Sequence, residues 1–159
     1  MNNRTVFSHS SDEWETPQEL FNELDREFHF TLDPCATDKN RKCRKYYTEK
    51  ENGIEKKWNG EIVFCNPPYS EIKRWVEKSF KESQTGCTVV LLIPSRTDTR
   101  WFHEYIYGKA EIRFLKGRLK FSGARYNAPF PSMVVIMRGG GMSKGGVRAE
   151  REKECETDL

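Results

Sequence analysis

The sequence has no apolar run that approaches the ~20 residues of a membrane-spanning helix. Its first residues, Met1-Asn2-Asn3-Arg4-Thr5, also lack the apolar core of a secretory signal. We therefore expect no membrane association and a cytoplasmic location.

Closely spaced pairs of cysteines are missing as well. The five cysteines at positions 35, 43, 65, 87 and 155 form no CxxC pair, and the three histidines have no ligand pattern beside them. These absences exclude the common zinc motifs, so we expect no bound metal. An odd number of cysteines is typical of free thiols in a reducing cytosol.

Charge is unevenly distributed although the net charge is only +3. Residues 1–38 carry nine acidic and two basic side chains, whereas residues 39–57 and 94–126 each carry eight basic and three acidic ones. Two separate basic segments favour a polyanionic partner on one side of the molecule. The alternative is that the two basic segments are lysine-rich surface loops in contact with solvent.

The length of 159 residues is typical of one domain. We expect a flexible N-terminus over 1–13, a folded domain over 14–138 and a disordered, Gly-rich and charged tail over 139–159. Residue patterns predict helices over 17–28, 70–83 and 98–107, and strands over 30–32, 61–65, 87–93, 111–115 and 132–137, with no strand in 37–60. Alternating strands and helices predict an α/β fold: a three-layer sandwich around a mostly parallel sheet of about five strands.

Capping patterns predict where two of these helices begin. Thr16 has the pattern of an N-cap, with Pro17 at the first helical position and Glu19 completing a capping box. Thr97 or Asp98 is the expected cap of the helix that ends near Tyr107.

The most informative stretch is Asn66-Pro67-Pro68-Tyr69, which directly follows the apolar strand 61–65. Each proline holds the preceding residue extended and lacks an N–H, so the backbone offers acceptors without competing donors. An amide, rigid carbonyls and a phenol ring at the carboxyl end of a strand suit a flat heterocycle with an exocyclic amine. Asn66 Oδ1 and the Pro67 carbonyl could each accept one amine proton, with Tyr69 stacked on the ring. The alternative is an ordinary Pro-Pro turn.

Asp33 occupies a comparable position at the end of the strand over 30–32. A carboxylate there can bind a cation or the amine of a ligand, or it can cap a turn.

Three segments together resemble a known family: Trp14-Glu15-Thr16-Pro17, Leu32-Asp33-Pro34-Cys35-Ala36 and Asn66-Pro67-Pro68-Tyr69, in that order. They resemble the DNA adenine-N6 methyltransferases, above all the small Dam-type enzymes encoded by bacteriophages. The resemblance covers residues 12–138. It implies a Rossmann-like methyltransferase fold, S-adenosylmethionine as cofactor, double-stranded DNA as partner, and the host cytoplasm as location.

The resemblance also implies roles for individual residues. Asn66, Pro67, Pro68 and Tyr69 match the catalytic motif. Thr16, Pro17, Asp33, Pro34, Cys35 and Ala36 match segments that line the cofactor pocket, with Asp33 near the methionine amino group. Phe121 lies about where relatives have an aromatic that helps to hold a flipped base. The family's glycine-rich cofactor loop is absent here, since Thr37-Asp38-Lys39-Asn40 follows Ala36, and Asn52 is the candidate adenine contact.

The expected function is therefore methyl transfer to adenine N6 in DNA after base flipping. Candidate phosphate contacts are the basic side chains that follow the strand over 87–93 or lie in the loop before the last strand: Arg96, Arg100, Arg118, Lys120 and Arg125. Two alternatives are open: methylation of RNA adenine or of a protein glutamine, and a non-catalytic DNA-binding relative.

Overall fold

The protein folds around one seven-stranded sheet, seen here in a computed structural model that describes residues 14–139 and 147–149. The strand order is β2-β1-β3-β4-β6-β5-β7. The elements in chain order are α2 (Gln18–Phe28), β1 (Leu32–Asp33), β2 (Lys45–Tyr46), β3 (Ile62–Cys65), the 3-10 helix η1 (Tyr69–Glu71), α3 (Ile72–Gln84), β4 (Thr88–Pro94), α4 (Arg100–Tyr105), β5 (Glu111–Phe114), β6 (Ser132–Met137) and β7 (Val147–Ala149).

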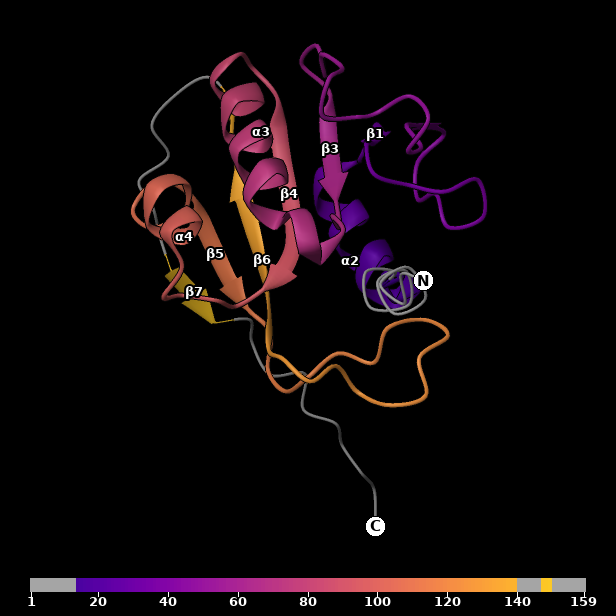
Figure 1. Ribbon diagram of the computed structural model, residues 1–159, viewed down its shortest axis with the longest axis vertical. Coiled ribbons are helices and arrows are strands. Elements are labelled where there is room, and N and C mark those ends of the chain that lie inside the picture. Colours follow the sequence, from indigo (N-terminus) through magenta and orange to yellow (C-terminus); the bar gives the residue numbers. More distant parts are fainter. Residues whose placement is uncertain (1–13, 140–146, 150–159) are drawn as a thin grey trace, which may run out of the picture.

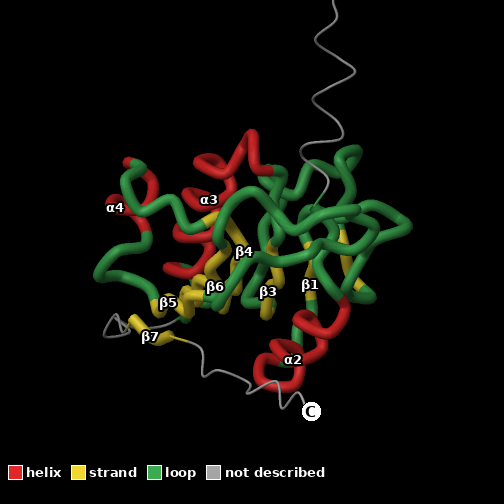
Figure 2. Tube along the Cα trace, turned by 90° about the horizontal axis from the view of Figure 1, so that it is seen from below, coloured by secondary structure: helices red, strands yellow, loops and turns green. Residues whose placement is uncertain are grey.

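The sheet is mostly parallel, because β6 alone runs against its neighbours. The strands β2, β1, β3 and β4 are parallel, so their carboxyl ends meet at one edge (Figure 1). Helices α3 and α4 cover one face of the sheet and α2 covers the other (Figure 2). This confirms the predicted three-layer α/β sandwich.

Alternation along β4 divides the apolar interior into two cores. Val89, Leu91 and Ile93 belong to the core that contains residues of α3 and α4, whereas Val90 and Leu92 belong to the core under α2. All five side chains are fully buried. Burial on both faces explains why this strand is a continuous apolar run in the sequence.

The helices are amphipathic as expected, but both predicted caps are wrong. Helix α2 buries Phe21, Leu24 and Phe28, yet its N-cap position is Pro17 and no side chain caps it. Thr16 is turned away, because its hydroxyl accepts a hydrogen bond from the Asn66 side chain. In α4 the capping side chain is Thr99, which accepts from the backbone N–H of Phe102.

The sheet has two strands more than the sequence predicted. Strand β2 lies within 37–60, where no strand was expected, and pairs in parallel with β1. Strand β7 lies in the segment predicted to be a disordered tail, and it pairs in parallel with β5. The predicted flexible N-terminus over 1–13 and the rest of the tail after residue 139 lie outside the described residues. No helix among the described residues is long and apolar enough to span a lipid bilayer.

Candidate active site at the carboxyl edge of the sheet

A cavity of about 670 Å³ opens where β1 and β3 end. It is large enough for a nucleotide-sized ligand, since such pockets measure roughly 300–1,000 Å³. Its wall consists of residues 14–16, 33–38, 40, 42, 48–50 and 52–54, together with Phe64, Asn66, Pro68, Ser70, Glu71, Arg74 and Trp75. Segments far apart in the sequence therefore converge on one space.

Asn66 follows β3 and contributes its side-chain amide to this wall. Its Nδ2 donates to the backbone carbonyl of Trp14 and, over 2.9 Å, to Thr16 Oγ1. Its Oδ1 is buried and has no hydrogen-bond partner among the described residues. A buried acceptor without a donor is costly in an empty site, so this oxygen is suited to a ligand that supplies an N–H.

A second unpartnered polar atom lies in the same wall. Trp75 Nε1 is buried and has no acceptor in the described part of the chain. Its indole stacks beside that of Trp58, with ring centroids 6.5 Å apart. The wall of the cavity thus presents one buried acceptor and one buried donor that its own side chains leave unused.

Tyr69 lies beside Asn66 in a cluster of aromatic rings. Trp14 is nearly parallel to it, with an interplanar angle of 20° and centroids 6.4 Å apart, and Phe130 meets it edge-on at 5.3 Å. Phe121 packs on Trp14 at 5.2 Å and is 2% exposed. Burial raises the pKa of the Tyr69 phenol, so this hydroxyl stays protonated near neutral pH.

Asp33 ends β1, the strand next to β3, and its carboxyl group is buried. Its Oδ2 accepts a hydrogen bond of 3.0 Å from the backbone N–H of Lys42. Burial raises the pKa of Asp33 to about 6, although the backbone N–H groups of Lys42 and Cys35 and the charge of Lys42 favour its ionised form. A cationic ligand group next to Asp33 would lower this pKa and stabilise the carboxylate.

Two thiols join these walls. Cys35 Sγ lies 3.6 Å from Cys65 Sγ and donates to the backbone carbonyl of Asn66 over 3.2 Å. Burial raises the pKa of Cys35 well above its usual value, and the neighbouring Cys65 raises it further. Cys35 therefore serves as a neutral hydrogen-bond donor between the ends of β1 and β3.

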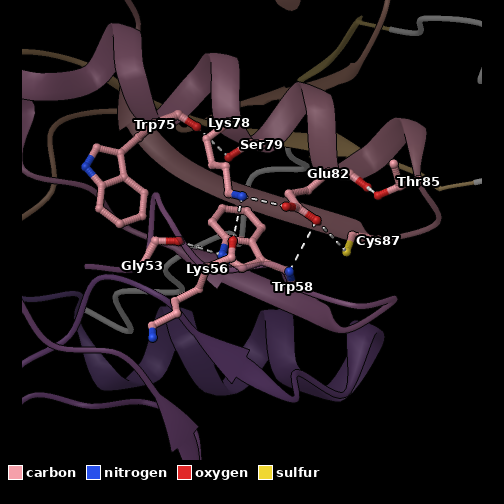
Figure 3. A network of polar contacts seen from close by, with 9 residues as sticks. All are labelled: Gly53, Lys56, Trp58, Trp75, Lys78, Ser79, Glu82, Thr85 and Cys87. Atoms are coloured by element: carbon pink, nitrogen blue, oxygen red, sulfur yellow. Dashed lines mark hydrogen bonds and ion pairs between the residues drawn. The ribbon is translucent and has the colours of Figure 1, made fainter. Parts of the chain in front are cut away.

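The wall over residues 52–54 is fixed from behind by a polar network on α3 (Figure 3). Trp58 Nε1 donates to the Gly53 carbonyl over 2.9 Å, and the Trp58 backbone N–H donates to Glu82 Oε2 over 3.3 Å. Lys78 bridges Glu82 and the backbone carbonyl of Lys56. Gly53 itself touches Pro34, because a Cβ at this position would lie 2.0 Å from the Pro34 carbonyl oxygen.

The structure brings most of the predicted cofactor and motif residues together. Thr16, Asp33, Pro34, Cys35, Ala36, Asn52, Asn66 and Pro68 all line the cavity. Pro17, Pro67 and Tyr69 do not line it. Pro17 precedes α2, Pro67 is buried between Asn66 and Pro68, which both line the cavity, and Tyr69 lies in the aromatic cluster.

The predicted DNA contacts lie outside this cavity. Arg96 and Arg100 follow the end of β4 and are exposed, as are Arg118, Lys120 and Arg125. The latter three belong to the loop between β5 and β6, which extends beyond the arrowheads of β3 and β4 (Figure 1). Phe121, in contrast, is buried within that loop.

The sequence did not predict part of the cavity wall. Residues 37–50 contribute Thr37, Asp38, Asn40, Lys42, Thr48, Glu49 and Lys50, the end of η1 contributes Glu71, and the start of α3 contributes Arg74 and Trp75. The short strand β2 carries the first of these segments to the cavity, and a two-residue strand leaves no periodic signal. Within residues 14–139 and 147–149, no three His, Cys, Asp or Glu side chains lie together as a metal site would require.

Comparison with known proteins gives one consistent result. A family described as DNA N-6-adenine-methyltransferase (Dam) matches residues 4–149. The chain is 30% identical over 110 residues to a DNA N-6-adenine-methyltransferase of Escherichia phage T1, which covers 68% of this chain and 46% of that protein. It is 31% identical over 107 residues to one of Haemophilus phage HP1 (strain HP1c1), covering 65% and 62%. The matched region is thus less than two thirds of either relative.

Proposed function

Because the chain belongs to the DNA N-6-adenine-methyltransferase (Dam) family, we propose that it transfers a methyl group from S-adenosylmethionine to adenine N6 in double-stranded DNA. The observation that carries this proposal is Asn66 Oδ1, a buried acceptor without a partner among the described residues, at the wall of a nucleotide-sized cavity. An adenine amine supplies the donor that this oxygen lacks.

The cavity fits the cofactor in size and in donor set. S-adenosylmethionine carries an α-ammonium group, and Asp33 offers a buried carboxyl group for it in the wall of the same cavity. Trp75 Nε1 offers an unused donor for a ligand oxygen. Asn52 lies in the wall beside Gly53, where we place the adenine end of the cofactor. When bound, the cofactor supplies an electrophilic methyl group on a sulfonium.

The residues after β3 would position the amine. The lone pair of an adenine amine is delocalised into the ring, which makes the nitrogen a poor nucleophile. Acceptance of one proton by Asn66 Oδ1 and of the other by the Pro67 carbonyl favours a pyramidal nitrogen with its lone pair directed outward. A neutral amide cannot serve as a general base, so positioning and electrostatics must provide the rate enhancement.

The target base must leave the duplex to reach this edge, which costs a few kcal/mol. Stacking on an aromatic ring returns about 1–3 kcal/mol per base. Tyr69 is the ring beside Asn66, and Trp14 and Phe130 now lie against it. We therefore propose that the base enters the aromatic cluster from the side of the loop between β5 and β6, whose arginines and lysine hold the phosphates.

The test is methyl transfer by the purified full chain. Incubation with S-adenosylmethionine labelled in its methyl group and unmethylated duplex DNA should yield N6-methyladenine, and the Asn66→Ala variant should yield none. Label that enters RNA or protein instead of DNA would assign the fold to another amine or amide. If calorimetry detects no binding of S-adenosylmethionine, the protein is a non-catalytic relative.

A further inference from the structure

We infer that the Trp14 carbonyl and the Thr16 hydroxyl are positioning groups for Asn66, which fix its amide so that only Oδ1 faces the substrate. This inference rests on the proposed function, since it concerns the same amide. It assigns Thr16 to the orientation of a catalytic side chain rather than to helix capping or cofactor contact.

The first step is the hydrogen-bond count of the amide. Asn66 Nδ2 carries two protons, one donated to the Trp14 carbonyl and the other to Thr16 Oγ1. Both donors of the amide are therefore used, while Oδ1 is unused. A rotation of the amide by 180° would place Oδ1 against the Trp14 carbonyl, and two acceptors would then face each other.

The second step is the rigidity of the two acceptors, the Trp14 carbonyl and the Thr16 hydroxyl, which together form a clamp on the Asn66 amide. Thr16 is 3% exposed, so its hydroxyl is shielded from water. The segment that carries both groups is fixed to the loop between β5 and β6, because Glu15 and Ser122 form an antiparallel bridge and the Ser122 N–H donates to the Glu15 carbonyl over 2.9 Å. Phe121 packs on the Trp14 ring from the same loop.

These contacts give residues 14–16 a role that their position in the sequence does not indicate. Thr16 and Trp14 lie 50 and 52 residues before Asn66, and two hydrogen bonds from the Asn66 side-chain amide link them to it. A clamp of two acceptors selects an amide at position 66 over a carboxylate, since a carboxylate has no proton to donate to the Trp14 carbonyl.

Thr16→Val tests the hydroxyl, because valine keeps the shape and removes the acceptor. We expect kcat to fall about tenfold, since one buried donor of Asn66 loses its partner, while the Kd for S-adenosylmethionine stays within twofold. Thr16→Ser restores the acceptor and should recover most of kcat. Thr31→Val is the matched control: its hydroxyl bonds the backbone of Ile62 at the amino end of β3, whereas the cavity lies at the carboxyl end of this strand. Weaker cofactor binding with unchanged kcat in Thr16→Val would overturn the inference, as would an equal loss in Thr16→Ser.

Asn66→Asp tests the Trp14 carbonyl, which no substitution can remove. The variant keeps an acceptor for the adenine amine, yet it places a carboxylate oxygen against a carbonyl oxygen. We expect kcat to fall about 100-fold at neutral pH, with circular dichroism unchanged. Activity within threefold of the wild type would show that the clamp does not orient this side chain.

A readout without turnover separates this inference from the proposed function. In ¹⁵N-labelled protein, the two side-chain amide protons of Asn66 should exchange slowly with water, and one of them should exchange faster in Thr16→Val but not in Thr16→Ser. If the wild type methylates no DNA, the proposed function fails, and this exchange pattern alone decides whether the clamp exists. Fast exchange of both protons in the wild type refutes it.

Discussion

At the scale of single residues, the site combines groups whose burial sets their protonation. Asn66 is neutral at all relevant pH values, and burial keeps Tyr69 and Cys35 protonated by raising their pKa values. Asp33 differs, because its raised pKa of about 6 lies close to physiological pH. It is therefore the residue through which pH can change the ligand affinity of the cavity.

Removal of the Asn66 side chain is the first prediction. Asn66→Ala deletes the unused acceptor and both donors to residues 14 and 16, so we expect kcat to fall by at least ~100-fold. Cofactor affinity should change less than threefold, because the other walls of the cavity remain. Calorimetry measures the affinity and a methyl-transfer assay measures kcat; a variant with normal turnover contradicts the assigned role.

Affinity for the cofactor should depend on pH through Asp33. A carboxyl group whose pKa is raised on folding binds its proton more tightly in the folded state, so its contribution to stability is fully present below pH ~4 and is lost as the pH rises through about 6. Ligand affinity has the opposite sign, because the ionised form attracts an ammonium group. We expect S-adenosylmethionine binding to weaken roughly tenfold for each pH unit below 6.

Two controls accompany this titration. Asp33→Asn should bind S-adenosylmethionine weakly with no pH dependence between 5 and 7. 5′-Methylthioadenosine, which lacks the ammonium group, should bind the wild type with a flat pH profile. An equally steep profile for this analogue would place the titrating group elsewhere.

At the scale of elements, the wall over residues 52–54 depends on close contact with the segment after β1 and with a network on α3. Gly53 approaches the Pro34 carbonyl too closely for any side chain. Behind it, Lys78 and Glu82 are 15% and 12% exposed and hold Trp58 in place (Figure 3). The wall is thus determined by one backbone contact and one shielded ion pair.

Gly53→Ala should move this wall. The new methyl group overlaps the Pro34 carbonyl, so the loop must shift, and we expect a loss of about 2–3 kcal/mol in the free energy of unfolding with weaker cofactor binding. Gly108→Ala is the comparison: its φ of +73° strains an alanine, but open space surrounds it, so about 1 kcal/mol is expected without a change in binding. Equal binding in both variants would show that the Pro34 contact does not shape the cavity.

The shielded ion pair can be compared with an exposed one on the same helix. Glu82→Ala removes partners from Lys78 and from the Trp58 N–H and should cost about 2 kcal/mol. Glu77→Ala breaks the pair with Lys81, whose side chain is 69% exposed, and should cost at most ~0.5 kcal/mol. Urea unfolding of both variants measures the difference, and equal costs would mean that the network does not stabilise the loop.

At the scale of elements, the sequence predicted some strands and missed others. Apolar runs of four or more residues predicted β3, β4 and β6, because burial of whole strands leaves a continuous signal. Strand β2 was missed because two residues contain no period, and the Gly-rich composition around β7 favoured a disordered tail. The helix cap predicted at Thr16 was wrong because a capping pattern and a long-range contact use the same hydroxyl.

The candidate site was predictable where chemistry alone limits the choice. Asn66 followed from a rare motif after a strand, and Asp33 from its place at the end of another. The wall over residues 37–50 was not predictable, since polar loop residues become neighbours of the cavity only through the fold. The contact of Asn66 with Trp14 spans 52 positions, and no pattern in the residues around either of them predicts it.

At the scale of the whole molecule, charge is arranged around the carboxyl edge of the sheet. The loop between β5 and β6 extends beyond that edge with exposed Arg118, Lys120 and Arg125 (Figure 1). Arg96 and Arg100 follow β4 at the same edge. A duplex that delivers a base to Asn66 would have its phosphates near these side chains.

Salt dependence tests this arrangement. Each phosphate contact steepens the log–log dependence of DNA affinity on salt by about one unit, so replacement of Arg118 and Lys120 by alanine should reduce the slope by about two for all sequences. Replacement of Lys56 and Lys57, which precede the amino end of β3, should leave the slope unchanged. Lost discrimination between sites with an unchanged slope would mean base contacts instead. If neither quantity changes, residues 39–45 become the preferred phosphate site.

The pair of thiols between β1 and β3 provides a group in the site that a chemical reagent can modify. Cys35 lines the cavity and is partly exposed, whereas Cys43, Cys65 and Cys87 are buried. A small alkylating reagent that enters the cavity therefore meets Cys35 first, slowly because the thiol is protonated. The rate of that labelling measures occupancy: a ligand that fills the cavity at a saturating concentration protects this sulfur, whether or not it is turned over.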